Sequence, residues 1–236
     1  MDTHPSFLID GQEVAFQAGQ TVLQAALAAG LNIPHLCFNP ELEPIGSCRL
    51  CLVEVAGCKL SACTLLAEEG LAVQHDTPRL RQLRIALLTF LLEQGKHTCI
   101  RCERTGDCRL QDAAIAFDAR TEADSASQVF PPNDDSHPEV SLNRDRCILC
   151  GICIQASRKL DGKNLFTFAG KGGDMMLTVE SPSGLLKDSA ISADDHAVRL
   201  CPVGALTRKH HPVQASFSSF DGFEGMDWGM PTEFSV

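Results

Sequence analysis

The sequence lacks any hydrophobic run long enough to cross a membrane. The longest strongly apolar stretch, residues 85–92, is interrupted by Thr89 and preceded by Arg84, whereas a spanning helix needs about 20 predominantly apolar residues. Residues 1–11 are polar, contain Pro5 and show no basic segment followed by an apolar core, so they do not resemble a secretory leader. We therefore expect a cytoplasmic protein without a membrane span.

Positive charge and phosphate-binding glycine motifs are also scarce. Lys and Arg number 20 against 30 Asp and Glu, which gives a net charge of -10, and nucleic-acid binding depends on clustered cationic side chains. The glycine-rich segment AGKGGD at residues 169–174 does not fit the dinucleotide-binding pattern and is more typical of a hairpin turn. We expect neither a nucleic-acid partner nor a flavin or nicotinamide site on this chain.

Cysteine, by contrast, is abundant, with twelve in 236 residues. Disulfides form in oxidising compartments, and the absence of a leader argues against export, so we interpret these cysteines as reduced metal ligands. Eleven of them fall into three groups. The chain length is compatible with one or two ordinary domains or with several small modules, and the grouping favours modules.

The first group has the spacing C-x10-C-x2-C-x11-C. Its members are Cys37, Cys48, Cys51 and Cys63. Four thiolates are what a 2Fe-2S cluster requires. A hairpin of residues 52–55 and 59–62 around Ala56-Gly57 would bring Cys51 and Cys63 to one end. A structural zinc site is the alternative, although zinc ligands usually come as two tight pairs.

The second group supplies three thiolates, leaving a 4Fe-4S cluster one ligand short. Its members are Cys99, Cys102 and Cys108. His97 lies two residues before Cys99, and imidazole is a competent metal ligand. The competing candidates are Cys58 and His75, although Cys58 is better interpreted as a small residue of the hairpin turn.

The third group predicts one 4Fe-4S cluster. Its members are Cys147, Cys150, Cys153 and the remote Cys201, which precedes Pro202 as in the cysteine-proline ending of such motifs. Ser157 stands where a bacterial ferredoxin has its next cysteine, so a pair of clusters is not expected here.

Local patterns predict several elements around these groups. Asp10-Gly11 between two apolar runs indicates a hairpin over residues 6–16, and Thr21 with Gln24 forms a capping box for a short helix ending at Gly30. Leucines at helical spacing predict an amphipathic helix over residues 79–92 that joins two cysteine modules.

Three segments carry a resemblance to a known family. CFNPELEPIGSCRLCLVEVAG resembles the 2Fe-2S module that opens the iron-sulfur subunits of respiratory complex I and its hydrogenase relatives, which implies a β-grasp fold. GKHTCIRCERTGDCRLQ is similar to the small diaphorase subunit of NAD-reducing nickel-iron hydrogenases, where a His also stands two residues ahead; in complex I the His is four residues ahead, at the position of Gly95. RCILCGICIQASRKL with CPVGAL resembles the third module of the same subunits.

The resemblance implies an α+β chain of successive modules. We expect a 2Fe-2S ferredoxin-type β-grasp domain at 1–78 and, at 79–125, a helical 4Fe-4S module whose ligands are one histidine and three cysteines. A linker at 126–139, a ferredoxin-like 4Fe-4S module at 140–212 and an acidic aromatic tail at 213–236 follow. The tail is either disordered or a docking peptide that orders on a partner.

The implied function is electron transfer. The chain would relay single electrons through one 2Fe-2S and two 4Fe-4S clusters, between an FMN/NAD-binding diaphorase large subunit and nickel-iron hydrogenase subunits. It would be part of an oxidoreductase without a catalytic site of its own. The alternatives are the equivalent relay of an NAD-dependent formate dehydrogenase or complex I-like enzyme, an iron-sulfur redox regulator, and a free ferredoxin.

Overall fold

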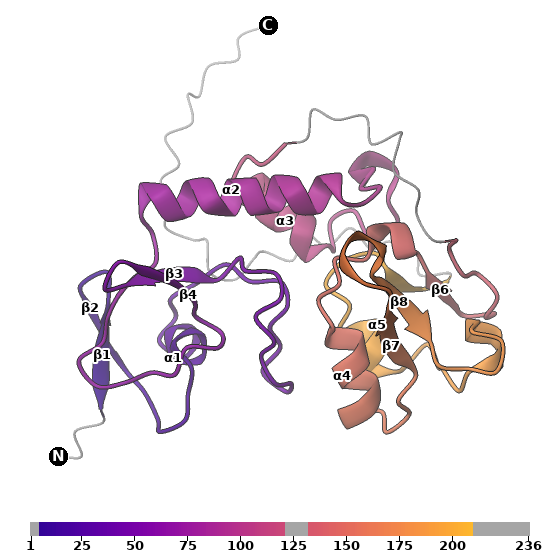
Figure 1. Ribbon diagram of the computed structural model, residues 1–236, viewed down its shortest axis with the longest axis horizontal. Helices are drawn as coiled ribbons and strands as arrows, with labels where there is room; N and C mark the ends of the chain where they lie inside the picture. The colour runs from indigo at the N-terminus through magenta and orange to yellow at the C-terminus, as the bar shows by residue number, and fades with distance from the viewer. Residues whose placement is uncertain (1–4, 121–131, 210–236) are drawn as a thin grey trace, which may run out of the picture.

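The computed structural model describes residues 5–120 and 132–209. The chain builds an N-terminal sheet module, a helical segment and a C-terminal module, and Figure 1 shows helix α2 (Pro78–Glu93) running from the first of these toward the last. Within the described ranges, none of the helices is both long and apolar enough to cross a bilayer. The predicted tail at 213–236 lies outside the described residues, as does the first part of the predicted linker.

The first module is a five-stranded mixed sheet with one helix. Its strands are β1 (Ser6–Ile9), β2 (Gln12–Ala15), β3 (Leu52–Val55), β4 (Cys58–Ser61) and β5 (Ala72–Gln74), in the order β2-β1-β5-β3-β4. Strands β1 and β5 are parallel and the other pairs are antiparallel. Helix α1 (Val22–Ala28) buries its apolar side chains in the same core as the sheet, so the predicted β-grasp fold is confirmed.

Local sequence signals explain the turns of this module. Asp10 and Gly11 both have positive φ, the backbone that a two-residue hairpin turn requires and that Asp-Gly tolerates. Thr21 and Gln24 make the predicted capping box. The β3–β4 hairpin is also confirmed, but β4 begins at Cys58 because Ala56 and Gly57, with φ of 49° and 79°, form a complete two-residue turn.

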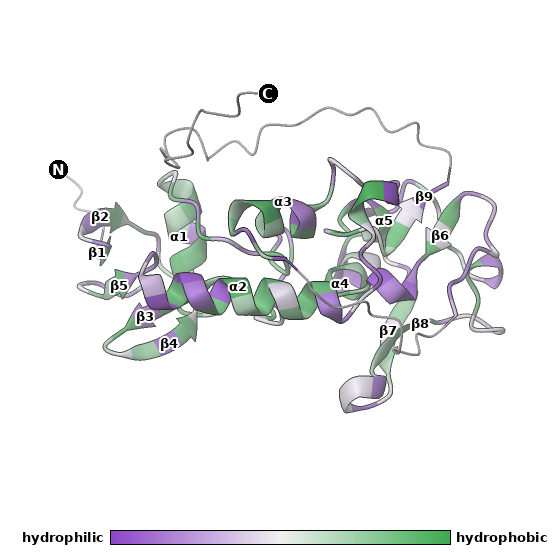
Figure 2. Ribbon diagram, turned by 90° about the horizontal axis from the view of Figure 1, so that it is seen from above, coloured by the Kyte–Doolittle hydropathy of each residue, from purple (hydrophilic) through white to green (hydrophobic). Residues whose placement is uncertain are grey.

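Helix α2 joins the first module to the second. It contacts β3 and α3 (Arg109–Ala116), and in Figure 2 the shorter α3 lies beside part of it. Leu80 and Leu88 are fully buried, as their spacing predicts, but so is Arg84 between them. A short 3-10 turn, η1 (Cys99–Arg101), follows α2.

The third module combines two separate two-stranded antiparallel sheets with short helices. Strand β6 (Val140–Leu142) pairs with β9 (Leu206–Arg208), and β7 (Phe166–Ala169) pairs with β8 (Met176–Val179). Its helices are α4 (Ile152–Lys159), α5 (His196–Arg199) and the 3-10 turns η2 (Arg144–Arg146), η3 (Gly172–Asp174) and η4 (Leu186–Asp188). The glycine-rich segment forms the β7–β8 turn, as predicted.

Residues 132–139, part of the segment predicted as a linker, pack against the third module. Asp134 is buried, exchanges backbone hydrogen bonds with Leu142 and accepts the backbone N–H of Leu186 at 2.7 Å. A buried carboxylate needs such donors. The polar residues of this segment are therefore not all solvent-exposed linker: Asp134 forms a buried hydrogen-bond network with the third module.

The hydrophobic core crosses the module boundaries. Leu36, Leu42 and Leu50, from the loop that carries the first cysteines, belong to the same buried cluster as Leu88 of α2 and Leu110 of α3, and this cluster continues into the third module. The sheet and α1 have a separate core. The first cysteine loop is thus held between its own sheet and the rest of the chain.

Candidate iron-sulfur sites

The four cysteines of the first group converge at one end of the β3–β4 hairpin. All four are buried, and Cys37 and Cys48 come from the loop between α1 and β3. The backbone N–H of Ala62 donates to the carbonyl of Cys51 at 3.0 Å, which brings Cys51 and Cys63 together. Their thiols hydrogen bond to each other, and the thiol of Cys37 hydrogen bonds to those of Cys48 and Cys63.

These contacts set the charge that the group holds without iron. Hydrogen bonds from Cys48 and Cys63 lower the pKa of Cys37, while the same interactions with Cys37 raise the pKa of Cys48 and of Cys63. Hydrogen bonding to Cys63 likewise lowers the pKa of Cys51, so Cys37 and Cys51 hold a negative charge more readily than Cys48 and Cys63. Four thiolates in this space need metal cations to neutralise them, so the donor set fits a 2Fe-2S cluster.

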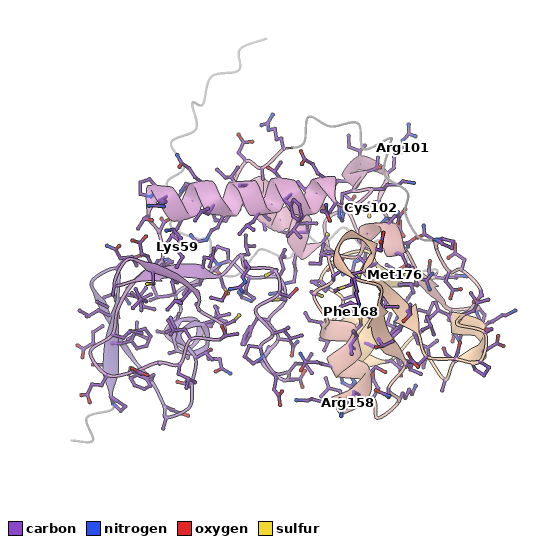
Figure 3. All side chains as sticks on the ribbon, viewed as in Figure 1. Lys59, Arg101, Cys102, Arg158, Phe168 and Met176 are labelled. Atoms are coloured by element: carbon purple, nitrogen blue, oxygen red, sulfur yellow. The ribbon has the colours of Figure 1, made fainter. Side chains whose placement is uncertain are left out.

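The second group lines a small cavity that also receives His97. Cys99 and Cys102 flank η1, and Cys108 immediately precedes α3. The cavity is lined by His97, Cys99, Cys102, Arg104, Thr105, Cys108, Gln111, Arg146 and Gly204. In Figure 3, Cys102 lies at the junction with the third module, while Arg101 points outward. Three thiols and one imidazole thus surround one space.

The environment of His97 suits a ligand. Burial and the nearby Arg146 charge lower the pKa of this imidazole, against a hydrogen bond to the backbone of Leu91. A neutral imidazole that donates one N–H to a carbonyl keeps its other nitrogen free for a metal. Gly95 makes room for the ring, because a Cβ at this position would lie 2.5 Å from His97 Nε2.

The two competing candidates lie elsewhere. Cys58 is exposed at the start of β4. The His75 ring lies against the carboxylate of Asp10, which also accepts the His75 backbone N–H at 2.9 Å. Neither residue lines the cavity of the second group.

The third group surrounds a second small cavity. Cys147 and Cys150 precede α4, Cys153 lies in its first turn, and Cys201 follows α5. The four cysteines line this cavity together with apolar side chains such as Phe168 and Leu177. Burial raises the pKa of Cys147 to about 11 and that of Cys153 further. Metal binding deprotonates such thiols, and the four donors fit a 4Fe-4S cluster.

Ser157 has a structural role at the position where a bacterial ferredoxin has its next cysteine. It is fully buried, its hydroxyl accepts the backbone N–H of Leu165 at 2.8 Å, and its carbonyl accepts the N–H of Lys163. The residue thus links α4 to the start of β7 and does not line the cavity of the third group.

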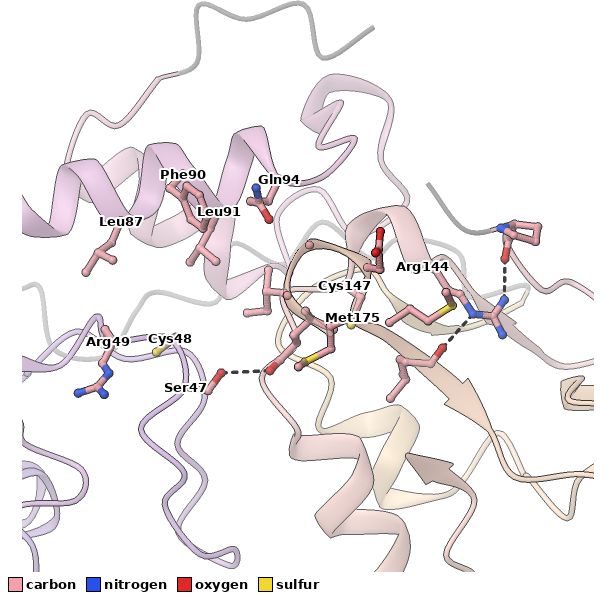
Figure 4. Close-up of a pocket in the computed structure, with 18 residues that line it drawn as sticks. Ser47, Cys48, Arg49, Leu87, Phe90, Leu91, Gln94, Arg144, Cys147 and Met175 are labelled. Carbon is pink, nitrogen blue, oxygen red and sulfur yellow. Dashed lines mark hydrogen bonds between the residues drawn. The ribbon is translucent and has the colours of Figure 1, made fainter. Parts of the chain in front are cut away.

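The third module contacts both of the others. Ser47 donates to the carbonyl of Leu149 at 3.0 Å, between the first and third cysteine loops. Lys96 donates its backbone N–H to Asp145 at 2.8 Å, between the second and third. Figure 4 shows the groove left between these parts, which is lined by Cys48 from the first group and Cys147 from the third. The third group therefore neighbours the other two.

Several arginines around the sites were not singled out by the sequence. Arg84 donates to the carbonyls of Leu50 and Leu52, on either side of Cys51, at 3.2 and 2.8 Å. Arg146 lines the second cavity and pairs with Glu103 at 2.7 Å. Arg146 directly precedes Cys147 in the sequence, but its side chain lines the cavity of the second group rather than the third, whereas no cysteine lies near Arg84 in the sequence.

No three His, Cys, Asp or Glu side chains within residues 5–120 and 132–209 form a site of the kind that holds a single metal ion. The ligands of an iron-sulfur cluster bind different irons of one polynuclear unit. The three groups are therefore assessed as donor sets around a cluster-sized space.

Family comparisons match all three parts of the chain. Residues 4–78 match the 2Fe-2S iron-sulfur cluster binding domain, residues 84–122 the NADH-ubiquinone oxidoreductase-G iron-sulfur binding region, and residues 140–207 a 4Fe-4S single cluster domain. These matches place iron-sulfur domains of both cluster types in the predicted order.

Similar proteins have related names. The gamma chain of the NAD-reducing hydrogenase HoxS from Cupriavidus necator is 32% identical over 85% of this chain and 86% of its own length. The mitochondrial 78 kDa subunit of NADH-ubiquinone oxidoreductase from Candida albicans is 30% identical, but the chain spans only 29% of that relative. A crystal structure of an NAD+-reducing [NiFe]-hydrogenase in the H2-reduced state aligns with a TM-score of 0.85 and 42% identity over 90% of both chains.

The buried cysteine groups, the domain matches and the similarity over most of the chain lead to one assignment. The chain belongs to the family of iron-sulfur electron-transfer subunits found in NAD-reducing hydrogenases and, as part of a longer subunit, in complex I-like oxidoreductases.

Proposed function

We propose that this chain relays single electrons between an FMN/NAD-binding diaphorase subunit and nickel-iron hydrogenase subunits. The observation that carries the proposal is that members of all three cysteine groups meet at one buried cluster: Cys37 and Cys48 of the first group, Cys108 of the second and all four cysteines of the third belong to it or pack against it. When bound, one 2Fe-2S and two 4Fe-4S clusters would each accept and release one electron at a time. The choice of partners rests on the similarity to NAD-reducing hydrogenases, whose names include NAD and nickel-iron chemistry.

We assign eleven cysteines and one histidine as ligands. Cys37, Cys48, Cys51 and Cys63 hold the 2Fe-2S cluster; His97, Cys99, Cys102 and Cys108 hold one 4Fe-4S cluster; Cys147, Cys150, Cys153 and Cys201 hold the other. His97 is favoured over Cys58 and His75 because it lines the cavity of its three cysteines. This assignment gives 2 + 4 + 4, or about ten irons per chain.

The contacts between modules support an order of electron transfer that differs from chain order. The third group lies beside the first through the Ser47 and Leu149 contact, and beside the second through the Arg109 N–H to Pro202 carbonyl hydrogen bond of 3.0 Å. We infer that the third group stands between the first and the second.

We also infer a cytoplasmic location, because free cysteines suit a reducing compartment.

Purification of the native complex tests the proposal. We expect the chain to co-elute in gel filtration with a flavin-containing subunit and a nickel-containing one, and metal analysis to give nickel with about ten irons per copy of this chain beyond those of its partners. Molybdenum or tungsten in place of nickel would instead support the formate dehydrogenase relay. A solitary chain of low mass would support a free ferredoxin and contradict the proposal.

A further inference from the structure

Arg109 stands where the three cysteine groups meet. It follows Cys108 of the second group directly and begins α3. Its backbone N–H donates to the carbonyl of Pro202, beside Cys201 of the third group, at 3.0 Å. Its side chain extends to the first module, where Nη1 lies 3.5 Å from the carbonyl of Phe38, beside Cys37.

The guanidinium interacts electrostatically with two of the groups. Its partners include the sulfur atoms of Cys37 and Cys48 in the first group and of Cys150 in the third. Burial lowers the pKa of Arg109, but an arginine side chain keeps its proton in proteins. A fixed positive charge therefore acts on both ligand sets from inside the protein, beside the carbonyl of Phe38, where a charge acts more strongly than in water.

The other titratable and charged groups near Arg109 or its two ligand sets include His35, Asp112, Arg84 and Arg144. His35, two residues before Cys37, has its pKa lowered by burial and by Arg109 itself. Asp112, in the first turn of α3, is a nearby acidic group that interacts with Arg109. Arg84 and Arg144 lie beside Cys51 and Cys147 respectively.

We propose that Arg109 raises the reduction potentials of both the 2Fe-2S site and the third-group 4Fe-4S site. Each reduction would add one electron, hence one negative charge, to the cluster held by a ligand set near this guanidinium. An electron passing between the two clusters would oxidise one and reduce the other without making or breaking a bond. Attraction to a shared cation favours the reduced form of each.

This inference rests on the proposed function, and its test uses potentials in the intact complex. Wild type, Arg109→Gln and the control Arg120→Gln would be titrated with a reductant while the EPR signal of each cluster is followed. Arg120 is the matched control because it carries the same charge on an exposed side chain paired with Asp118. The presence of three signals in the wild type tests the proposed function separately.

We expect Arg109→Gln to lower the potentials of the first and third sites, each by about tenfold in the reduction equilibrium, or about 59 mV for a one-electron couple. The second site should shift less, because the side chain extends away from it, and Arg120→Gln should match wild type. Unchanged potentials in Arg109→Gln, or equal shifts at all three sites, would overturn the inference even with all clusters present.

A second variant decides the matter if Arg109→Gln does not assemble. Asp112→Asn removes the acidic group that offsets Arg109, so the potentials of the first and third sites should rise while all ligands remain. If the reduction potentials of the first and third sites in Asp112→Asn were equal to or lower than those of wild type, the proposed effect of the Arg109 charge would be contradicted.

Discussion

At the scale of single residues, Gly95 and His97 share one space. The family resemblance places a histidine at position 95 in complex I, whereas here glycine stands there and the imidazole of His97 occupies the adjoining volume. A side chain at position 95 would also meet the backbone oxygen of Asp145 at 2.6 Å, and backbone gives way less readily than a side chain. The position of the ring therefore depends on the absence of a Cβ at residue 95.

We predict that Gly95→Ala displaces the His97 ring and alters the EPR signal of one 4Fe-4S cluster, with up to a few irons lost per chain. The reason is the 2.5 Å approach of the added Cβ to Nε2. Gly173→Ala is the control, since a Cβ there meets nothing within 4 Å and its φ is ordinary. Identical spectra for Gly95→Ala and wild type would show that the ring does not need this space.

We also predict that His97→Ala changes the signal of the same cluster and leaves the other two unchanged. The imidazole is the fourth donor around a cavity with three thiols, and loss of a ligand alters cluster potential and stability. Cys58→Ser serves as the comparison, because Cys58 is exposed at the start of β4, away from the cavity of the second group. The assignment would be wrong if Cys58→Ser gave the change and His97→Ala did not.

At the scale of elements, Arg84 connects α2 to the strand that begins after Cys51. Its side chain is almost fully buried, with 1% exposure, on the helix face that the leucine spacing predicted to be apolar. It donates to the carbonyls of Leu50 and Leu52, the two neighbours of Cys51. A buried arginine is stable here because its charged N–H groups are hydrogen bonded.

Replacing Arg84 with alanine should therefore be costly. We predict that Arg84→Ala lowers the free energy of unfolding by about 3 kcal/mol, because it leaves a cavity and removes the donor from two carbonyls. Arg79→Ala, at an exposed position of the same helix, should stay within about 0.5 kcal/mol of wild type. Denaturant unfolding, monitored by loss of cluster absorbance, measures both. Equal midpoints for the two variants would argue against the anchoring role.

At the scale of the whole molecule, the third module contacts both of the other modules. Gln155 of α4 clamps the backbone of Glu43: its Nε2 donates to the Glu43 carbonyl at 2.9 Å, and its Oε1 accepts the Glu43 N–H at 3.2 Å. Lys159 pairs with the Glu43 carboxylate at 2.6 Å. These contacts hold the first cysteine loop against α4, although Glu43 and Gln155 are 112 positions apart in sequence.

We predict that Gln155→Ala loosens this contact. Hydrogen exchange of the Glu43 amide should become faster by roughly fivefold or more, because both backbone groups lose their partner. Lys159→Ala should have a smaller effect, since exposed ion pairs contribute little. Protection factors from exchange mass spectrometry would separate the two variants. Faster exchange in Lys159→Ala than in Gln155→Ala would contradict the clamp.

The sequence by itself determined the content of the sites. Cysteine spacing grouped the thiols, because ligands of one cluster come from short local turns plus one remote position, and both appear directly as intervals such as those around Cys150 and Cys201. The Asp10-Gly11 turn, the Thr21 capping box and the 169–174 turn were likewise predicted, since each depends on local backbone preferences. For the fourth ligand of the second group, the sequence offered three candidates, namely His97, Cys58 and His75.

Tertiary structure decided what lies between the sites. Nothing in the order of the groups indicates that the third module contacts both of the others, or that the Arg109 side chain lies against Phe38 beside Cys37, because long side chains and packed loops join residues far apart in sequence. The burial of Arg84 was hidden for the same reason: its hydrogen-bond acceptors are backbone carbonyls, which leave no mark in the sequence. Spacing specifies local ligands, whereas packing of the shared core sets the distances between them.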